Sequence, residues 1–142
     1  MSASLTLRYE FSRTDDFGWL AATIETPQLR ATGGYWVQWQ DLEDWATTLT
    51  RYPIPIDAPL DADWGFSCDD VYRAIIRVAV AAVDRSGHLD ALVELRNHVD
   101  ERLFARAAFR TSYAELQRFA AELAAMMSRH IKEAVLTGQS SG

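Results

Sequence analysis

The feature that most constrains the fold is a change of hydrophobic period that occurs twice along the chain. Apolar and polar residues first alternate with a period of two, which is typical of β-strands with one buried face. Each alternating region is followed by apolar residues spaced three and four apart, the spacing of a helix that buries one side. The pattern therefore predicts an α+β fold in which each half has three antiparallel strands and one helix.

The boundaries of these elements follow from turns and caps. In the first half we expect strands at residues 5–11, 19–26 and 29–37, followed by a helix that ends before Pro53. In the second half we expect strands at residues 71–84, 89–96 and 102–111. Ser112 and Glu115 form a capping box, in which each side chain satisfies a free amide at the helix start. This second helix is expected to run through Ile131 and to end before Gly138.

The two halves also match residue by residue at one fixed offset. Leu29 corresponds to Leu103, an offset of 103 − 29 = 74. The same offset relates further apolar pairs: Ala31 and Ala105, Tyr35 and Phe109, Trp39 and Tyr113, Leu42 and Leu116, Trp45 and Phe119, Ala46 and Ala120, Leu49 and Leu123. Unrelated strand and helix segments would share some of these matches, but a gap-free match at both periods favours a duplication, and it places all these pairs on apolar faces.

These patterns predict one domain with an internal repeat. Residues 1–138 are expected to form a single α+β domain, duplicated over about residues 4–52 and 71–136. The halves would form a pseudo-symmetric antiparallel sheet with two packed helices. Residues 53–70 would be an acidic, proline-containing connection, and residues 139–142 a disordered tail.

Charge and composition restrict the classes of function. Fourteen basic and twenty acidic residues give a net charge of −6, which argues against non-specific nucleic-acid binding. The single cysteine, Cys68, cannot form an intramolecular disulfide. The first residues lack the apolar centre of a signal peptide, and the apolar run at 74–83 is too short for a bilayer and contains Arg77. We expect a cytoplasmic protein that does not associate with membranes, as a monomer or homodimer.

The acidic connection contains most of the candidate binding residues. Five carboxylates surround two aromatic side chains there, and a basic protein could recognise them through charge complementarity and a buried aromatic anchor. The alternative is a solvated loop whose aromatic residues pack onto the sheet. Trp36 is a further candidate, because it points opposite to Tyr35 and Val37 if its strand is regular. The candidate partner-binding residues are Asp57, Asp61, Asp63, Trp64, Asp69, Asp70 and Trp36.

No catalytic, metal-binding or cofactor motif is recognisable. The histidines, His88, His98 and His130, are scattered over two turns and a helix, without the spacing of a zinc site. Gly33 and Gly34 lie within a strand, with no lysine after them, so they are not a phosphate-binding loop. We therefore expect no catalytic residues, no metal and no cofactor, and a function other than catalysis.

The order of elements resembles that of small bacterial proteins grouped with the WapI-type immunity family. The resemblance is in Leu29 to Leu49 and Ile75 to Met126, where an aromatic-rich strand precedes a helix. It implies an inhibitor encoded near a secreted toxin, which covers the active site of the toxin or an adjacent surface. The expected function is therefore a cytoplasmic immunity protein that binds a basic protein toxin. The alternative is a small-ligand-binding or regulatory module with an apolar cleft between sheet and helices.

Overall fold

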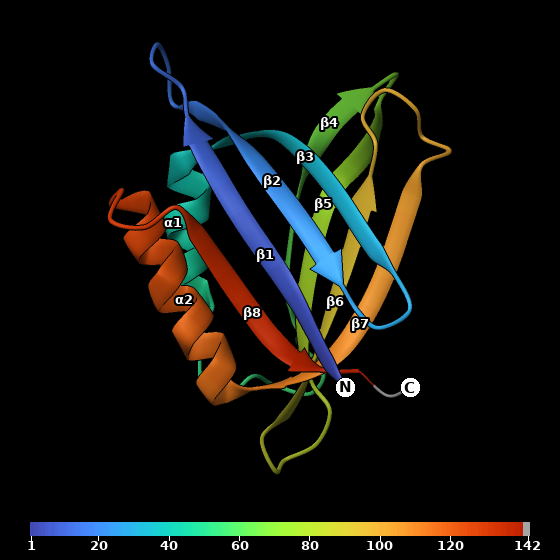
Figure 1. Cartoon of the computed structure of the whole chain (residues 1–142), viewed down its shortest axis with the longest axis vertical. Coiled ribbons are helices and arrows are strands. Elements are labelled where there is room, and N and C mark those ends of the chain that lie inside the picture. The colour runs from blue at the N-terminus through green and yellow to red at the C-terminus, as the bar shows by residue number, and fades with distance from the viewer. Residues whose placement is uncertain (141–142) are drawn as a thin grey trace.

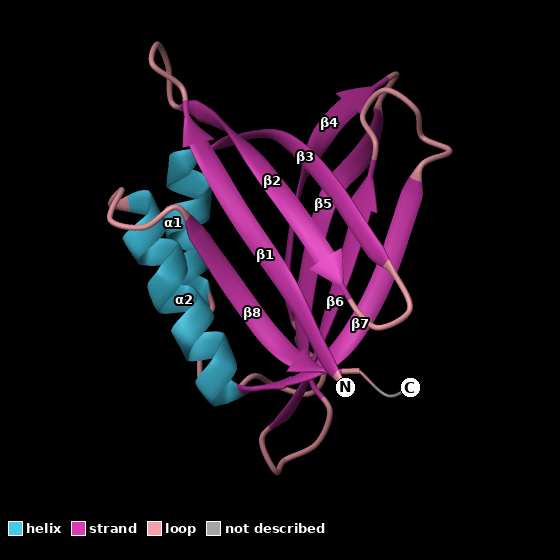
Figure 2. Ribbon diagram, viewed as in Figure 1, coloured by secondary structure: helices cyan, strands magenta, loops and turns pink. Residues whose placement is uncertain are grey.

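Eight antiparallel strands form one sheet that is bent into two layers, as the computed structural model of residues 1–140 shows (Figure 1). The strand order is β3-β2-β1-β8-β7-β6-β5-β4. The strands are β1 (Ser2–Phe11), β2 (Phe17–Glu25), β3 (Arg30–Gln38), β4 (Leu60–Cys68), β5 (Val71–Ala82), β6 (His88–Arg96), β7 (Phe104–Ser112) and β8 (Glu133–Gln139). The helices are α1 (Trp39–Thr48) and α2 (Tyr113–Met127), and they lie side by side at the opening between the layers (Figure 2).

The seam between the two layers is narrow. β7 and β8 share one registered pair, Arg110 with Gln139, whereas β1 and β8 pair from Ser2 to Arg8. From this seam the layer β3-β2-β1-β8 and the layer β7-β6-β5-β4 diverge, which gives the V shape seen in Figure 1. β3 and β4 are the two terminal strands of the sheet, so each has an edge without a partner strand among residues 1–140.

The expected α+β class, with an antiparallel sheet and two packed helices, is confirmed. The element order is strand-strand-strand-helix-strand, twice. β3 and β7 begin and end 74 residues apart, and α1 and α2 begin 74 residues apart, the offset found in the sequence. The fourth strand of each half pairs with the first strand of the other half: β4 with β5, and β8 with β1. The origin of this order by duplication stays a prediction.

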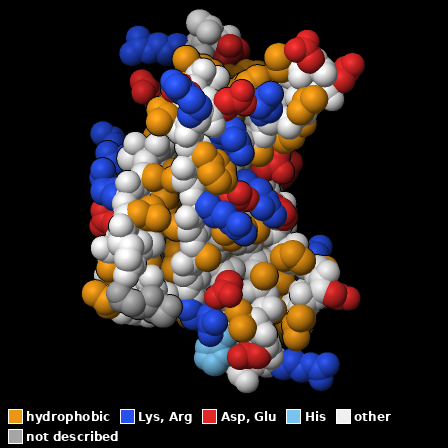
Figure 3. All heavy atoms as spheres, turned by 90° about the vertical axis from the view of Figure 1, so that its right-hand side faces the viewer, with side chains coloured by type: hydrophobic (Ala, Val, Ile, Leu, Met, Phe, Trp, Pro, Cys, Tyr) orange, Lys and Arg blue, Asp and Glu red, His pale blue; other side chains and the backbone are white. Residues whose placement is uncertain are grey.

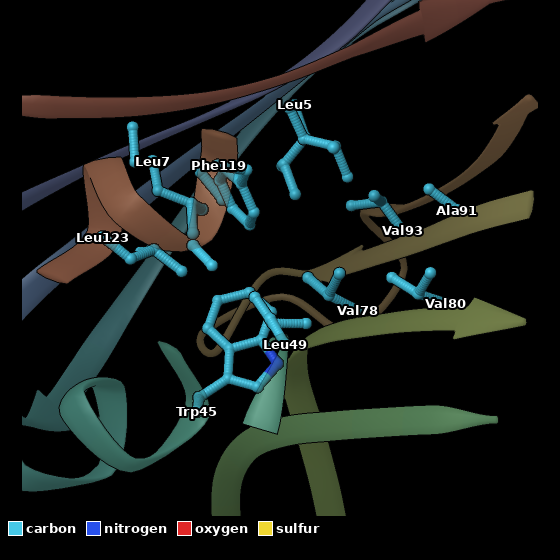
Figure 4. Close-up of a cluster of buried hydrophobic side chains, with 14 of the residues drawn as sticks. Leu5, Leu7, Trp45, Leu49, Val78, Val80, Ala91, Val93, Phe119 and Leu123 are labelled. Atoms are coloured by element: carbon cyan, nitrogen blue, oxygen red, sulfur yellow. The ribbon is translucent and has the colours of Figure 1, made fainter. Parts of the chain in front are cut away.

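The core lies between the layers and the helices (Figure 4). Leu5 and Leu7 of β1 face Phe119 and Leu123 of α2, and all four are fully buried. Trp45 and Leu49 at α1 pack with valines of β5 and β6 on the other side. Side chains therefore fill the space between sheet and helices where an apolar cleft was expected for the ligand-binding alternative. Half of the expected capping box forms, since the Ser112 hydroxyl accepts a hydrogen bond from the Glu115 amide at 3.3 Å. The Glu115 carboxylate instead accepts hydrogen bonds from Arg118 and Thr137.

Two elements differ from the expectation. Residues 60–68 form β4, so the connection expected at residues 53–70 contains a strand. α2 ends at Met127, and β8 occupies the region where the helix was expected to continue. Gln139, assigned to the tail, belongs to β8, and the amide of Ser140 donates to the carbonyl of Met1. The remaining two tail positions, 141–142, lie outside the described residues.

One pair of the repeat was placed on the wrong surface. Leu29 and Leu103 precede β3 and β7 and are 37% and 59% exposed, although the offset placed both on apolar faces. The four pairs from Leu42 with Leu116 to Leu49 with Leu123 are buried. The strands reach the core only after their first residues, so a repeated leucine at a strand start does not pack there.

Candidate functional site

A cleft of about 370 Å³ lies between the free edge of β3 and the upper ends of β6 and β7. Residues 31–34 of β3 form one wall, and the end of β6, the following loop and the start of β7 form the other. Gly33 leaves room for Leu95, whose Cβ would lie 3.5 Å from an added methyl group. Gly34 is covered by the indole of Trp19, whose atoms would be 2.6 Å from an added methyl group. The two glycines thus allow other side chains to approach the backbone closely.

Aromatic rings continue from this cleft along the edge of β3. The indole of Trp19 meets that of Trp36 edge-to-face at 5.1 Å, and its centroid lies 6.1 Å from the ring of His98. His98 also lies 6.0 Å from Tyr35, whose ring stacks on Phe66 of β4 at 6.0 Å. These contacts connect both layers of the sheet through the loop between β6 and β7. Edge-to-face and stacked pairs of this kind stabilise the arrangement beyond their buried area.

Exposed apolar side chains gather around the same loop. Trp36 is 54% exposed and Val99, in the loop, is 83% exposed. Phe104 lines both the cleft and an adjoining depression that also contains Val71 and Tyr72. We define the rim patch as Trp36, Val71, Tyr72, Val99, Leu103 and Phe104. Single exposed apolar residues need no explanation, but a group around two adjoining hollows marks a candidate interaction surface.

The predicted acidic residues do not form one loop. Asp57 lies before β4, Asp61 and Asp63 lie on β4, and Asp69 and Asp70 form the turn to β5. β4 extends over nine residues, about 30 Å at the rise of an antiparallel strand. Both turn residues have positive φ, 53° and 63°, as two-residue hairpin turns require. The carboxylates are therefore spread along an edge strand and its end.

The two carboxylates on β4 already have partners. Arg77 binds Asp61 through two nitrogens, at 2.7 and 3.1 Å, and also pairs with Glu94. These hydrogen bonds, that of Asp61 first, raise the pKa of the Arg77 guanidinium. The hydroxyl of Tyr72 donates to Asp63 at 2.5 Å, and burial followed by this hydrogen bond raises the pKa of Tyr72. Figure 3 shows basic and acidic side chains next to each other on this side, with apolar ones between them.

The aromatic candidates have different surroundings. Trp64 points inward from β4, and its ring meets Trp45 edge-to-face at 5.1 Å, so the packing interpretation holds for this residue. Trp36 lies on the outer face and is exposed, as a candidate interface residue should be. The residues that sequence reasoning missed are Trp19, Arg96, His98 and Phe104. The exposed apolar residues at 99, 103 and 104, around a turn, were the signal that could have indicated them.

Residues 1–140 contain neither a group of metal-binding side chains nor a membrane-spanning helix. No three histidine, cysteine, aspartate or glutamate side chains in that range come close enough to hold a metal ion. None of the helices in the described part has the length and apolarity to cross a bilayer. No protein-family model, curated protein or solved structure matches this chain.

Proposed function

We propose that this protein acts by binding another protein through the rim patch. The observation that carries the proposal is the grouping of six exposed apolar side chains around the loop between β6 and β7. Large aromatic residues with polar surroundings provide most of the binding energy in protein interfaces. Trp36 and Phe104 are such residues. The guanidinium of Arg96 lies over the ring of Phe104, and the charged residues 100–102 are in the loop just before it.

The partner that we propose is a toxin, and the protein would act as a cytoplasmic immunity protein without catalysis. The resemblance in the order of elements supports this choice. An immunity protein needs a rigid surface that covers part of its toxin, and strands β3, β5 and β7 carry four of the six residues of the rim patch. The ion pair with Arg77 offsets the negative charge of Asp61, and the hydrogen bond from Tyr72 occupies one oxygen of Asp63. We therefore assign the main contact to the rim patch, with Asp57, Asp69 and Asp70, which form no ion pair within residues 1–140, as the carboxylates for a basic toxin.

A rescue assay tests this function. The open reading frame next to this gene is expressed in a bacterial host alone and then with this protein. Toxicity that disappears on co-expression supports the proposal, whereas a harmless neighbour, or a toxic one without rescue, contradicts it. Val99→Asp should abolish rescue, because a charge in the centre of an apolar interface is desolvated without a partner. Val83→Asp is the matched control, since Val83 is also exposed but precedes the hairpin at the opposite end of β6.

The cleft itself favours a second candidate function, the binding of a small ligand. It has aromatic, apolar and cationic walls, formed by Trp19, Leu95, Phe104 and Arg96. Its volume of about 370 Å³ is in the range of small-molecule sites. A ligand that fits there should raise the melting temperature in a screen of planar carboxylates, and Trp19→Ala should remove that shift. A melting temperature that no compound of this class raises would contradict this function.

A further inference from the structure

The edge of β3 that borders the cleft has backbone groups without partners. The amide of Thr26 donates to the carbonyl of Leu29 at 2.9 Å, and the amide of Trp39 donates to the carbonyl of Asp16 at 3.1 Å. These bonds and the β2–β3 register fix which residues of β3 bond to β2, because bonded residues alternate along an antiparallel strand. The bonded residues have odd numbers, from 29 to 39. The amides and carbonyls of Thr32, Gly34 and Trp36 therefore point to the free edge.

This edge is open beside Gly33, while the ring of His98 lies next to its upper part, 6.0 Å from the ring of Tyr35. The residue between Thr32 and Gly34 is Gly33, so at this position β3 has no side chain on the face opposite to that of Thr32. Thr32 and Gly34 both line the cleft, so their backbone groups border its open space. Trp36 lies at the upper end of the edge, where its exposed indole would cover an apolar side chain of an added strand. An extended peptide could thus continue the sheet at β3 and occupy the cleft.

The unpaired charge at the cleft is positive. The guanidinium of Arg96 lies 4.6 Å from the ring centroid of Phe104, and no carboxylate in residues 1–140 forms an ion pair with it. The nearby carboxylates are occupied, since Asp100 binds Arg102 at 2.9 Å and Glu101 pairs with Arg73. A carboxylate of a ligand could therefore accept two hydrogen bonds from the guanidinium of Arg96. A cationic ligand would have no such partner here, because the nearby carboxylates already form ion pairs.

We infer that the free edge of β3 accepts, as a ninth strand, an extended and mainly apolar segment of a partner protein that carries one carboxylate. The backbone of the segment pairs with Thr32 and Gly34, and one of its carboxylates binds Arg96. The inference rests on the proposed function, because it specifies how part of the partner is bound. It differs from that function in requiring the backbone of β3, which the rim patch alone does not use.

Two pairs of variants separate the edge from the rest of the surface. Thr32→Pro removes an outward amide without removing a bond to β2, and edge strands accommodate proline for this reason. Thr32→Val keeps that amide and is its control. Arg96→Gln removes the free guanidinium. Arg106→Gln is its control, because Arg106 is on the same outer face, has no ion pair in the described chain and does not line the cleft.

The experiment selects binders from a phage-displayed library of random nine-residue peptides against the full-length protein. The enriched peptides should contain Asp or Glu at one fixed position between alternating apolar residues. Measured by fluorescence anisotropy, their affinity should fall at least tenfold with Thr32→Pro and with Arg96→Gln, and less than twofold with the two controls. Replacing the peptide carboxylate by its amide should cause a similar loss, and that loss should disappear in Arg96→Gln.

Several results would overturn the inference. The inference is wrong if selection on the parent protein enriches no peptide beyond those enriched on the Thr32→Pro protein. It is also wrong if the enriched peptides bind the Thr32→Pro and Arg96→Gln proteins with unchanged affinity. It also falls if the protein alone dimerises in light scattering and Thr32→Pro abolishes the dimer, because a second copy then occupies the edge. Toxin rescue that survives both edge variants but not Val99→Asp would retain the proposed function and reject strand addition. A failed rescue would reject the immunity function and leave the peptide result to decide the edge.

Discussion

A single methyl group at Gly138 should weaken the seam between the two layers of the sheet. A Cβ at this position would lie 2.1 Å from the carbonyl oxygen of Arg110 and 2.5 Å from the ring of Phe109. The nearest of these atoms belongs to the backbone of β7, so β7 or β8 must move by about 1 Å to restore an ordinary contact distance. The only registered pair between the two strands, Arg110 with Gln139, is adjacent to this contact.

The expected free-energy change is the difference of two effects. Overpacking in a close-packed region costs about 1–3 kcal/mol. Replacing glycine by alanine restricts the unfolded chain, which stabilises the folded state by about 0.4–1 kcal/mol. We therefore expect Gly138→Ala to lower the free energy of unfolding by about 1–2 kcal/mol.

Gly33→Ala is the matched control, because it makes the same change without an overlap. Its added methyl group would be 3.5 Å from the Cβ of Leu95, an ordinary contact. This variant should be as stable as the parent protein or more stable by up to about 1 kcal/mol. Urea unfolding, followed by the fluorescence of the five tryptophans, gives both values. Equal midpoints for the two variants, or a lower midpoint for Gly33→Ala, would refute the role of Gly138 at the seam.

Three further predictions concern the core, a helix cap and a buried tyrosine. Phe119→Ala should lower the free energy of unfolding by about 3–5 kcal/mol, because the ring is fully buried between α2 and the sheet, and a loss below 1 kcal/mol in urea unfolding would contradict this packing. Ser112→Ala should cost about 1 kcal/mol, because the amide of Glu115 loses its acceptor, while Ser112→Asp should retain most of the stability in thermal unfolding. Burial, and secondarily Asp15, raises the pKa of Tyr9 to about 12, above the value of 10.0 of an unfolded tyrosine. As the pH rises, the unfolded state therefore loses the Tyr9 proton first, so the contribution of Tyr9 to stability is constant below pH 10 and declines up to about pH 12. Tyr9→Phe should remove this part of the decline when urea midpoints are measured across the same pH range. Parallel curves of midpoint against pH for the two proteins would contradict the assignment.

The strand that sequence reasoning missed inside the acidic connection shows what local patterns cannot supply. Leu60, Ala62 and Trp64 alternate with two aspartates, which is a strand pattern. Proline and aspartate dominate the segment and favour a loop when it is considered alone. What makes it a strand is its neighbour β5, because Arg77 and Tyr72 bind the two carboxylates. Both partners lie outside residues 53–70, so the pattern of that segment alone does not predict these contacts.

The missed boundary after α2 has a different cause. Helices commonly end at a glycine with positive φ, and the sequence has none near residue 129. In the structure Arg129 itself takes this conformation, with φ 64°, and its guanidinium lies 4.1 Å from the ring centroid of Phe11. A contact with the first strand therefore stabilises the stop, and the sequence around residue 129 carries no sign of it.

The candidate site was predicted only in part. Strand alternation predicted that Trp36 points away from Tyr35 and Val37, toward a second layer or solvent, and the structure shows that this face is exposed. The rest of the rim patch combines residues of β5 and β7 with a loop, and only the bend of the sheet places them near Trp36 of β3. The number of aspartates predicted a binding surface at residues 57–70, whereas the ion pair between Asp61 and Arg77 follows only from the three-dimensional structure.

The position of β8 has a consequence for synthesis of the protein on the ribosome. β8 follows all other elements in the chain, yet it lies in the middle of the sheet, between β1 and β7. While residues 133–139 are still being made, β1 has an open edge and the two layers have no strand between them. A nascent chain can therefore complete its hairpins early but joins the two layers only after β8 has been synthesised. Until then the exposed edge of β1 is a binding site for chaperones and for other nascent chains.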